Sequence, residues 1–340
     1  MKTTDFAEYL TSYFSAWLPG QKNLSSNTIL SYRDTFRLLL TYCKKVRGIT
    51  PEKLTVKMLT ESLVSEFLQW LENERRCCIT TRNQRLAAIH AFVRYLQLEM
   101  PEQLLEFQRI LAIPAKKTSH KPVEYLAPDA LSALLSCPDL LTPRGRRDLA
   151  MLTLLYDSGA RVSELADLKI RDVRLDAPST ITLHGKGRKT RCVPLMSKTA
   201  ALMRCYFAEQ SLLDRSEKLD APVFFNSRFE KLTRAGIAYI LNKYVERVRN
   251  DGNVLLPESV SPHCMRHSKA VHMLQANVNL IYIRDFLGHV NVSTTEIYAK
   301  VDAETKRAAL EKAYLPNSHI EYPEWNANKD LMAWLDNLCK

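Results

Sequence analysis

Apolar side chains recur at helical spacing through the first third of the chain. The spacing predicts three helices, at Ser26–Lys45, Val56–Glu74 and Thr80–Leu98, separated by short polar breaks. The last of them places its larger apolar residues on one face: Leu86, Ile89, Phe92, Val93 and Leu96. We therefore expect residues 1–114 to form a domain of four or five helices.

A basic segment follows this domain. Residues 115–121 read Ala-Lys-Lys-Thr-Ser-His-Lys, show no apolar periodicity and are followed by Pro122. Proline disfavours a helical conformation in the residue before it, so we expect an extended basic linker over residues 115–124.

The residues after the linker predict a second, mainly helical domain over residues 125–315. Leu149–Asp157 is an apolar helix that Gly159 can end with a left-handed cap, and Ser163 is a candidate N-cap for the next helix. Further on, Ser261 and Pro262 supply an N-cap and a first-turn proline, so a helix begins there.

Two short strands interrupt these helices. Thr180–Leu183 and Thr190–Pro194 have the composition of strands, and the glycine-rich residues 185–188 form the turn between them. The predicted fold class is therefore mainly α, with a small antiparallel β-sheet in the second domain.

The end of the second domain predicts two short helices. Leu280–Leu287 is expected to end at Gly288. Ser293 and Glu296 then form a capping box that starts a helix bearing Tyr298.

Length and charge add to this picture. A chain of 340 residues exceeds what one hydrophobic core usually serves, which favours two domains. Lys and Arg number 48 against 37 Asp and Glu, and the net charge of +11 favours a polyanionic partner without separating DNA from RNA or lipid. Apolar runs fall short of membrane-spanning length, so we expect no membrane partner.

The cysteine pattern predicts neither disulfides nor a metal ion. The eight cysteines show no paired Cys-x-x-Cys spacing and no signal peptide precedes them, so reduced thiols in the cytoplasm are expected. Cys264 lies between His263 and His267, yet a structural zinc site normally needs four ligands at recognisable spacing. We expect no metal and no cofactor.

Short segments of the second domain carry the residues that point to a chemistry. They read Ser158-Gly-Ala-Arg-Val-Ser-Glu-Leu, His184-Gly-Lys-Gly-Arg-Lys-Thr-Arg, Pro262-His-Cys-Met-Arg-His-Ser, and Leu287-Gly-His with Thr294-Thr-Glu-Ile-Tyr298. This ordered set resembles the tyrosine recombinase (phage integrase) family, in its Xer-like form. The resemblance is strong over Leu126–Val301, and one departure is Lys300, where relatives often carry His.

The resemblance implies a site-specific recombinase that breaks and rejoins DNA strands through a covalent 3′-phosphotyrosyl intermediate. It implies that the first domain is the SAM-like core-binding domain, which closes with the catalytic domain around duplex DNA. The partners it implies are double-stranded DNA at specific recombination sites and a homotetramer on synapsed duplexes, with an accessory recombinase or directionality protein as a further candidate. The expected location is the cytoplasm, in association with the nucleoid.

The residue types suit this chemistry. A phosphodiester resists attack because its oxygens are negative and the transition state concentrates more charge on them. Arginine stays charged and binds two oxygens at once, so Arg161 and Arg266 are predicted to clamp the non-bridging oxygens, with His289 as a third donor. Tyr298 is the predicted nucleophile.

Proton transfer needs two more groups. The tyrosine hydroxyl must lose a proton and the leaving oxygen must gain one. His263 is the candidate base and Lys186 the candidate acid, with Lys189 as the alternative acid from the same turn. Glu164 either orients the site or only caps its helix.

Other basic residues are candidates for DNA contact. They are Arg82 and Arg85 in the Thr80–Leu98 helix, Lys116, Lys117 and Lys121 in the linker, and Arg188 and Lys189 in the turn. For either arginine of the helix, a solvated face is an equally good interpretation.

The tail, residues 316–340, predicts an oligomerising helix. Lys329–Leu338 has one apolar side, and so short a helix must bury that side against another surface. Docking on its own catalytic domain is one interpretation. Docking into a neighbouring protomer is favoured, because relatives often exchange a C-terminal helix around a ring.

Three other functions compete with the favoured one, the integration or excision of a mobile element. Xer-type resolution of chromosome or plasmid dimers uses the same motifs. A type IB topoisomerase shares the chemistry. A non-catalytic, architectural DNA-binding protein is the alternative from another class, and the six filled catalytic positions argue against it.

Overall fold

The computed structural model describes residues 3–118, 123–185, 189–211, 219–289, 293–299 and 337–338. The chain divides into two compact units, Met1–Lys121 and Pro122–Lys340, and the division falls within the predicted linker. Both units are mainly helical, and the second contains a small antiparallel sheet, so the predicted fold class is confirmed.

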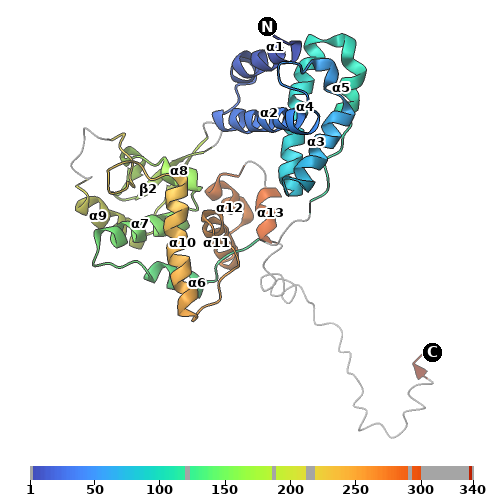
Figure 1. The fold of residues 1–340 in the computed structure, drawn as a ribbon. Coiled ribbons are helices and arrows are strands. Elements are labelled where there is room, and N and C mark those ends of the chain that lie inside the picture. Colours follow the sequence, from blue (N-terminus) through green and yellow to red (C-terminus); the bar gives the residue numbers. More distant parts are fainter. Residues whose placement is uncertain are drawn as a thin grey trace. The chain divides into compact units, whose positions relative to one another are not determined.

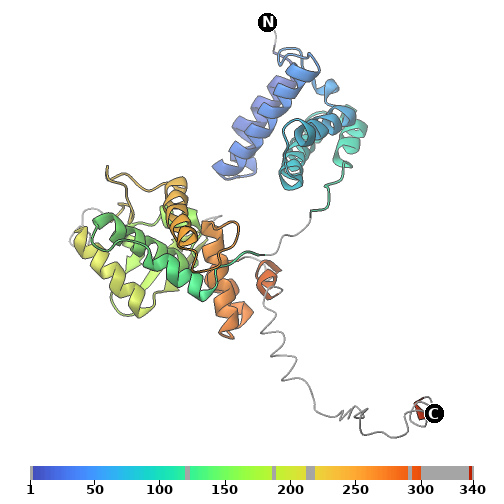
Figure 2. The same ribbon diagram turned by 60° about the horizontal axis from the view of Figure 1, so that its bottom comes forward.

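The first unit is a bundle of helices, seen from two directions in Figures 1 and 2. Its elements are α1 (Asp5–Ser12), η1 (Tyr13–Gln21), α2 (Ser26–Val46), η2 (Val56–Met58), α3 (Glu61–Asn73), α4 (Ile79–Glu99), η3 (Pro101–Gln103) and α5 (Leu104–Leu111). Buried phenylalanines from five of these elements share one core: Phe6, Phe36, Phe67, Phe92 and Phe107. The predicted helices at Ser26 and Thr80 agree with α2 and α4 to within one residue at each end.

The predicted helix Val56–Glu74 was wrong at its start. Thr60 is the N-cap of α3, and its hydroxyl accepts a hydrogen bond from the Leu63 amide at 3.2 Å. Such a cap satisfies an amide that has no partner inside the helix, and so marks where the helix begins. The apolar residues before Thr60 form the single 3₁₀ turn η2 instead.

The second unit combines helices with a three-stranded sheet. Its elements are α6 (Pro128–Ser136), α7 (Pro143–Asp157), α8 (Val162–Ala166), η4 (Ile170–Asp172), β1 (Val173–Arg174), β2 (Thr180–His184), β3 (Thr190–Pro194), α9 (Ser197–Glu209), α10 (Arg234–Asp251), α11 (Pro262–Gln275), α12 (Leu280–Leu287) and α13 (Ser293–Ala299). The strands are ordered β1-β2-β3, all antiparallel, and His184 pairs with Thr190 beside the turn. The two-residue β1 was not predicted, because it is too short to show alternation.

Two helix starts in the second unit differ from the predictions. α7 begins at Pro143, six residues before Leu149, because Thr142 caps it. The N-cap of α8 is Arg161 and not Ser163, since the Glu164 carboxylate accepts the Arg161 backbone N–H at 2.9 Å. The first turn of α8 thus carries both a site arginine and the acid that contacts it.

The predicted tail helix and the capping box at Ser293 fall outside the described side chains, apart from Asn337 and Leu338 of the tail. Among the helices that the structure describes, none has both the length and the apolar character needed to cross a membrane.

Candidate active site

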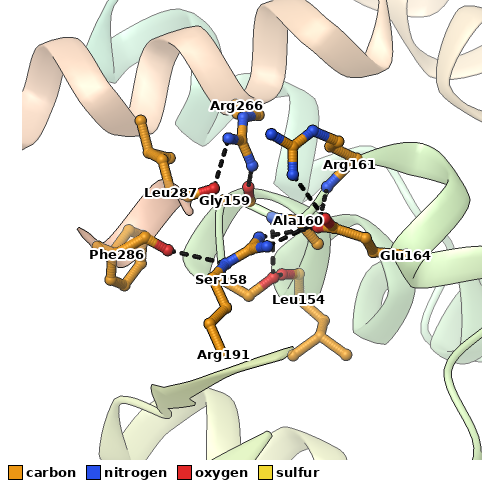
Figure 3. A network of polar contacts seen from close by, with 10 residues as sticks. All are labelled: Leu154, Ser158, Gly159, Ala160, Arg161, Glu164, Arg191, Arg266, Phe286 and Leu287. Carbon is orange, nitrogen blue, oxygen red and sulfur yellow. Dashed lines mark hydrogen bonds and ion pairs between the residues drawn. The ribbon is translucent and has the colours of Figure 1, made fainter. Parts of the chain in front are cut away.

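Arg266 lies buried at the centre of the candidate site. Ser261 caps α11 and Pro262 occupies its first turn, as predicted, and the helix turns Arg266 inward, where it is 3% exposed. Its guanidinium donates from Nη1 to the Gly159 carbonyl at 2.5 Å and from Nη2 to the Leu287 carbonyl at 2.6 Å (Figure 3). Arg266 therefore joins the α7–α8 turn to the end of α12.

The charge of Arg266 survives its burial. Burial and, after it, the neighbouring Arg161 and Arg191 lower its pKa to about 10. The guanidinium is still protonated at neutral pH, so Arg266 contributes a positive charge to the site.

Arg161 reaches the same place from the N-terminus of α8. Its Nη1 donates to Glu164 Oε1 at 2.7 Å, and its side chain is about one third exposed. Gly159 makes the preceding turn possible: its φ is +56°, and a Cβ there would lie 2.9 Å from the Leu287 side chain. The close packing of this turn on α12 brings Arg161 and Arg266 together.

Glu164 is an ionised carboxylate in a nearly dry position, with its side chain 2% exposed. Burial by itself raises its pKa, but hydrogen bonds from Arg191 and from the Arg161 backbone outweigh burial, so the pKa is lowered. Glu164 therefore stays charged and holds two arginines, which favours an orienting role over a helix cap alone.

Arg191 belongs to the site, although the sequence analysis did not assign it. It lies on β3, and its Nη1 and Nη2 donate to the two oxygens of Glu164 at 3.0 and 2.8 Å. Its Nε donates to the Phe286 carbonyl at 3.0 Å (Figure 3). Strand alternation could have indicated it, because Arg191 falls on the same face as the buried Val193.

Tyr298 is buried, with 1% exposed, and meets a histidine that the sequence analysis did not assign. Its hydroxyl lies 2.8 Å from His267 Nδ1. Burial raises the pKa of Tyr298, while burial followed by His263 and Arg266 lowers the pKa of His267 to about 4. At neutral pH the pair is a neutral phenol beside a neutral imidazole, which has one ring nitrogen free to accept a hydrogen bond.

His263, the predicted base, lies one helical turn before the histidine that contacts Tyr298. Its side chain is exposed in the first turn of α11, and its ring centroid lies 6.4 Å from that of His267. Among the described side chains, the hydrogen-bond partner of the Tyr298 hydroxyl is His267, one helical turn further on. The geometry thus favours His267 over His263 as the proton acceptor.

His289 follows the left-handed residue Gly288, whose φ of +66° ends α12 as predicted. Its Nδ1 lies 3.0 Å from the Thr295 hydroxyl, and its ring stacks on Tyr298 with centroids 6.4 Å apart. Burial, then Arg266 and Arg161, lower the pKa of His289 to about 4. A neutral imidazole has one N–H, so with Nδ1 accepting from Thr295 it can donate through Nε2.

The turn between β2 and β3 is described only at its ends. Lys186 and Arg188 lie outside the described residues. Lys189 is exposed, and its carbonyl accepts from the Gly185 amide at 2.7 Å. Lys189 thus lies at the end of the β2–β3 turn, and Lys186, the predicted acid, belongs to the same turn in the sequence.

Two family models match the chain. A family model described as the phage integrase family matches residues 124–305, and one described as the phage integrase N-terminal SAM-like domain matches residues 11–100. The chain belongs to the phage integrase family of tyrosine recombinases. The first unit of the recombinase is accordingly the SAM-like domain, and the site lies in the part matched by the integrase model.

Relatives and solved structures agree with this. A putative integrase/recombinase of Sinorhizobium fredii is 36% identical, over 99% of both chains. The tyrosine recombinase XerC of Oceanobacillus iheyensis is 32% identical, over 93% of this chain and 96% of the relative. In fold, the recombinase resembles XerH bound to difH substrate, at 22% identity with TM-score 0.66 over 85% of this chain and 81% of XerH.

Arg82 and Arg85 form hydrogen bonds within the first unit of the recombinase. Arg82 is 6% exposed and donates to the Pro114 carbonyl at 3.0 Å. Arg85 is half-buried and donates to the Ser31 carbonyl at 3.0 Å. The guanidinium groups of both residues thus bond backbone carbonyls of the first unit, one at Pro114 after α5 and one at Ser31 within α2.

The remaining candidates for DNA contact are lysines and an arginine of the linker and of the β2–β3 turn. All three described lysines among them are exposed, and Lys116 forms an ion pair with Glu72 at 2.7 Å; the other two are Lys117 and Lys189. Lys121 lies outside the described residues. In the described ranges no cluster of three His, Cys, Asp or Glu side chains is arranged to hold a metal ion.

Acidification is expected to destabilise the recombinase between about pH 6.5 and pH 4. His267 and His289 have folded pKa values of about 4, below the usual 6.5, so in this range the unfolded chain binds protons that the folded chain does not. The stability these residues contribute is complete above the unfolded pKa and is lost as the pH falls. Urea unfolding of the full chain at pH 7 and pH 4.5 measures the change.

The matched variant for this prediction is His267→Gln, which removes one of the histidines whose pKa is lowered. Its stability should fall less between pH 7 and pH 4.5 than that of the wild type. Equal pH dependence in both proteins would contradict the burial of a neutral His267.

Proposed function

We propose that this recombinase cleaves and rejoins duplex DNA at specific sites through a covalent 3′-phosphotyrosyl intermediate formed by Tyr298. The observation that carries the proposal is the placement of Tyr298 in the same site as Arg266. Its hydroxyl contacts His267, and its ring stacks on His289. A nucleophile, a proton acceptor and fixed cations are the parts that a phosphoryl transfer requires.

The charges suit a phosphodiester. Arg161, Arg191 and Arg266 carry three positive charges around the single negative charge of Glu164. The site therefore keeps a positive excess to offset the anionic phosphate and the charge that the transition state adds. Arg161 and Arg266 would bind the non-bridging oxygens, and His289 would donate a third hydrogen bond.

The proton balance follows from the same contacts. The Tyr298 oxygen forms a bond to phosphorus while its proton passes to Nδ1 of the neutral His267. The bond from phosphorus to the 5′ oxygen breaks, and that oxygen takes a proton from Lys186 or, as the alternative, Lys189. His263 remains an alternative acceptor, because catalytic contacts can tighten when substrate binds. Rejoining reverses these steps and uses the energy kept in the ester.

The substrate and assembly are proposed from charge and relatives. The net charge of +11 suits a polyanion. XerH was solved bound to a palindromic difH substrate, and the Tn1549 transposon integrase, 16% identical with TM-score 0.65, was solved in complex with transposon right end DNA. We propose double-stranded DNA as the partner, a homotetramer on synapsed sites, and a cytoplasmic, nucleoid-associated location.

We favour integration or excision of a mobile element as the biological role. The Sinorhizobium fredii relative, a putative integrase/recombinase, matches over essentially the full chain and at higher identity than the XerC relative does. Resolution of chromosome or plasmid dimers is the second candidate, because XerC proteins also match over most of their length.

Trapping the intermediate tests the reaction. A core sequence is first selected by the protein from a random duplex library, and a duplex carrying that core is then nicked close to the cleavage position. The short fragment released on cleavage diffuses away, so a covalent protein–DNA band should accumulate on a denaturing gel. A protein that binds the selected core but forms no such band would be a DNA-binding protein and not a strand transferase.

Chelation should leave this cleavage unchanged. The positive charge that the reaction needs is supplied by guanidinium groups, of which Arg266 is held by two backbone carbonyls. The same assay with and without excess EDTA measures the effect. Loss of the covalent band in EDTA, restored by a divalent ion, would contradict the arginine clamp as the main source of charge.

A further inference from the structure

We propose that Arg191 is a positioning residue for strand cleavage. It pairs with the charged Glu164 carboxylate, so that Arg161 can present its remaining donors to the phosphate. The proposal rests on the function proposed above. It concerns the last residue of the segment 184–191, to which the sequence motifs assigned no role.

The first support is the complete use of the Glu164 carboxylate. Oε1 accepts from Arg161 Nη1 and Arg191 Nη1, and Oε2 accepts from the Arg161 backbone and Arg191 Nη2 (Figure 3). A carboxylate offers about four lone-pair positions, so Glu164 has no acceptor capacity left. Arg161 consequently spends only one side-chain donor on it within the described part of the chain.

The second support is what the removal of Arg191 would do. Glu164 would remain buried with one cationic partner, and a buried carboxylate that loses a partner is costly. The cheapest remedy is for Arg161 to turn its second amino group onto the freed oxygens in a bidentate pair. Arg161 would then face Glu164 and not the phosphate.

The third support is the contact of Arg191 with α12. Its Nε donates to the Phe286 carbonyl, in the last turn before Gly288 and His289. Its aliphatic part lies against Gly288, where an added Cβ would come within 3.0 Å of Arg191 Cδ. One side chain on β3 thus fixes both the Arg161 end and the His289 end of the site, and lysine cannot copy this because it lacks the planar fork.

The test compares Arg191→Met and Arg191→Lys with a matched control, Arg146→Met. Arg146 lies outside the site and also donates two hydrogen bonds to a carboxylate and one to a backbone carbonyl. The carboxylate is Glu209, at 2.9 and 2.7 Å, and the carbonyl is that of Leu140, at 2.7 Å. The probe is the nicked duplex that carries the selected core. Three quantities are measured for each variant: the single-turnover rate of covalent adduct formation, the affinity for the same duplex, and the melting temperature.

Arg191→Met should cleave on the order of 100-fold more slowly, as expected when a donor to the transition state is lost, with DNA affinity nearly unchanged. Arg191→Lys keeps the charge without the planar fork, so its cleavage rate should lie between those of Arg191→Met and the wild type. Arg146→Met should cleave at the wild-type rate. If Arg191→Met fails to fold, which its melting curve would show, Arg191→Lys carries the comparison.

A modified substrate separates positioning from general loosening of the fold. In a methylphosphonate, a methyl group replaces one charged non-bridging oxygen, so less positive charge is needed at that position. If Arg191 acts through Arg161, Arg191→Met and Arg161→Lys should both recover toward the wild-type rate on the same methylphosphonate diastereomer. A merely structural defect would slow both substrates equally.

The outcomes are distinct. A wild-type rate for Arg191→Met or Arg191→Lys, or an equal defect on the two substrates, overturns the role of Arg191 while leaving the proposed function intact. Absence of a covalent adduct with the wild-type protein overturns the proposed function itself, and the role of Arg191 with it.

Discussion

Tyr298→Phe should abolish the covalent protein–DNA adduct and leave DNA affinity nearly unchanged. The substitution removes the attacking oxygen and no positive charge, so the reaction stops while the electrostatic part of DNA binding remains. The side chain is 1% exposed and its hydroxyl bonds only His267 among the described residues, so the ring should keep its place in the apolar cluster. Adduct formation and a binding titration on the selected core measure the two effects.

Tyr282→Phe is the control for this prediction. Tyr282 lies on α12 and is 70% exposed. The control should form the adduct at the wild-type rate. Adduct remaining in Tyr298→Phe would overturn the assignment of the nucleophile and direct attention to Tyr282.

Arg161→Lys should slow cleavage on the order of 100-fold or more. Lysine keeps the charge and can still pair with Glu164, but it cannot bind two phosphate oxygens through a planar fork. The backbone N–H that Glu164 accepts is retained, so the start of α8 should survive the change. The adduct rate and the melting temperature are measured together, with Arg146→Lys as the control. A near wild-type rate in Arg161→Lys would argue against the clamp.

Arg266→Lys should lose both cleavage and stability, because its position is different. Arg266 supplies the hydrogen bonds to the buried Gly159 and Leu287 carbonyls, and lysine cannot reach both. An unsatisfied buried acceptor costs about 1–3 kcal/mol. A lower melting temperature in Arg266→Lys, and not in Arg161→Lys, would separate the buried arginine from the partly exposed one.

Local signals predicted much of the fold. Ser261 with Pro262, and the left-handed Gly288, marked the ends of α11 and α12 correctly because capping depends on a few adjacent residues. The same reasoning was wrong at Ser163, since the Glu164 side chain reaches back to the Arg161 amide and moves the cap by two residues. Pattern alone could not choose between two polar caps so close together.

The ordered motifs of the sequence determined the family, the helical fold with its small sheet, and the residue types of the site. Only the tertiary structure decided that His267 and not His263 contacts Tyr298, and that Arg191 completes the pairing of Glu164. The tertiary structure also decided that Arg82 is buried. These contacts join elements far apart along the chain, and which of several equivalent histidines or arginines meets a partner depends on how helices pack, a property that no local spacing encodes.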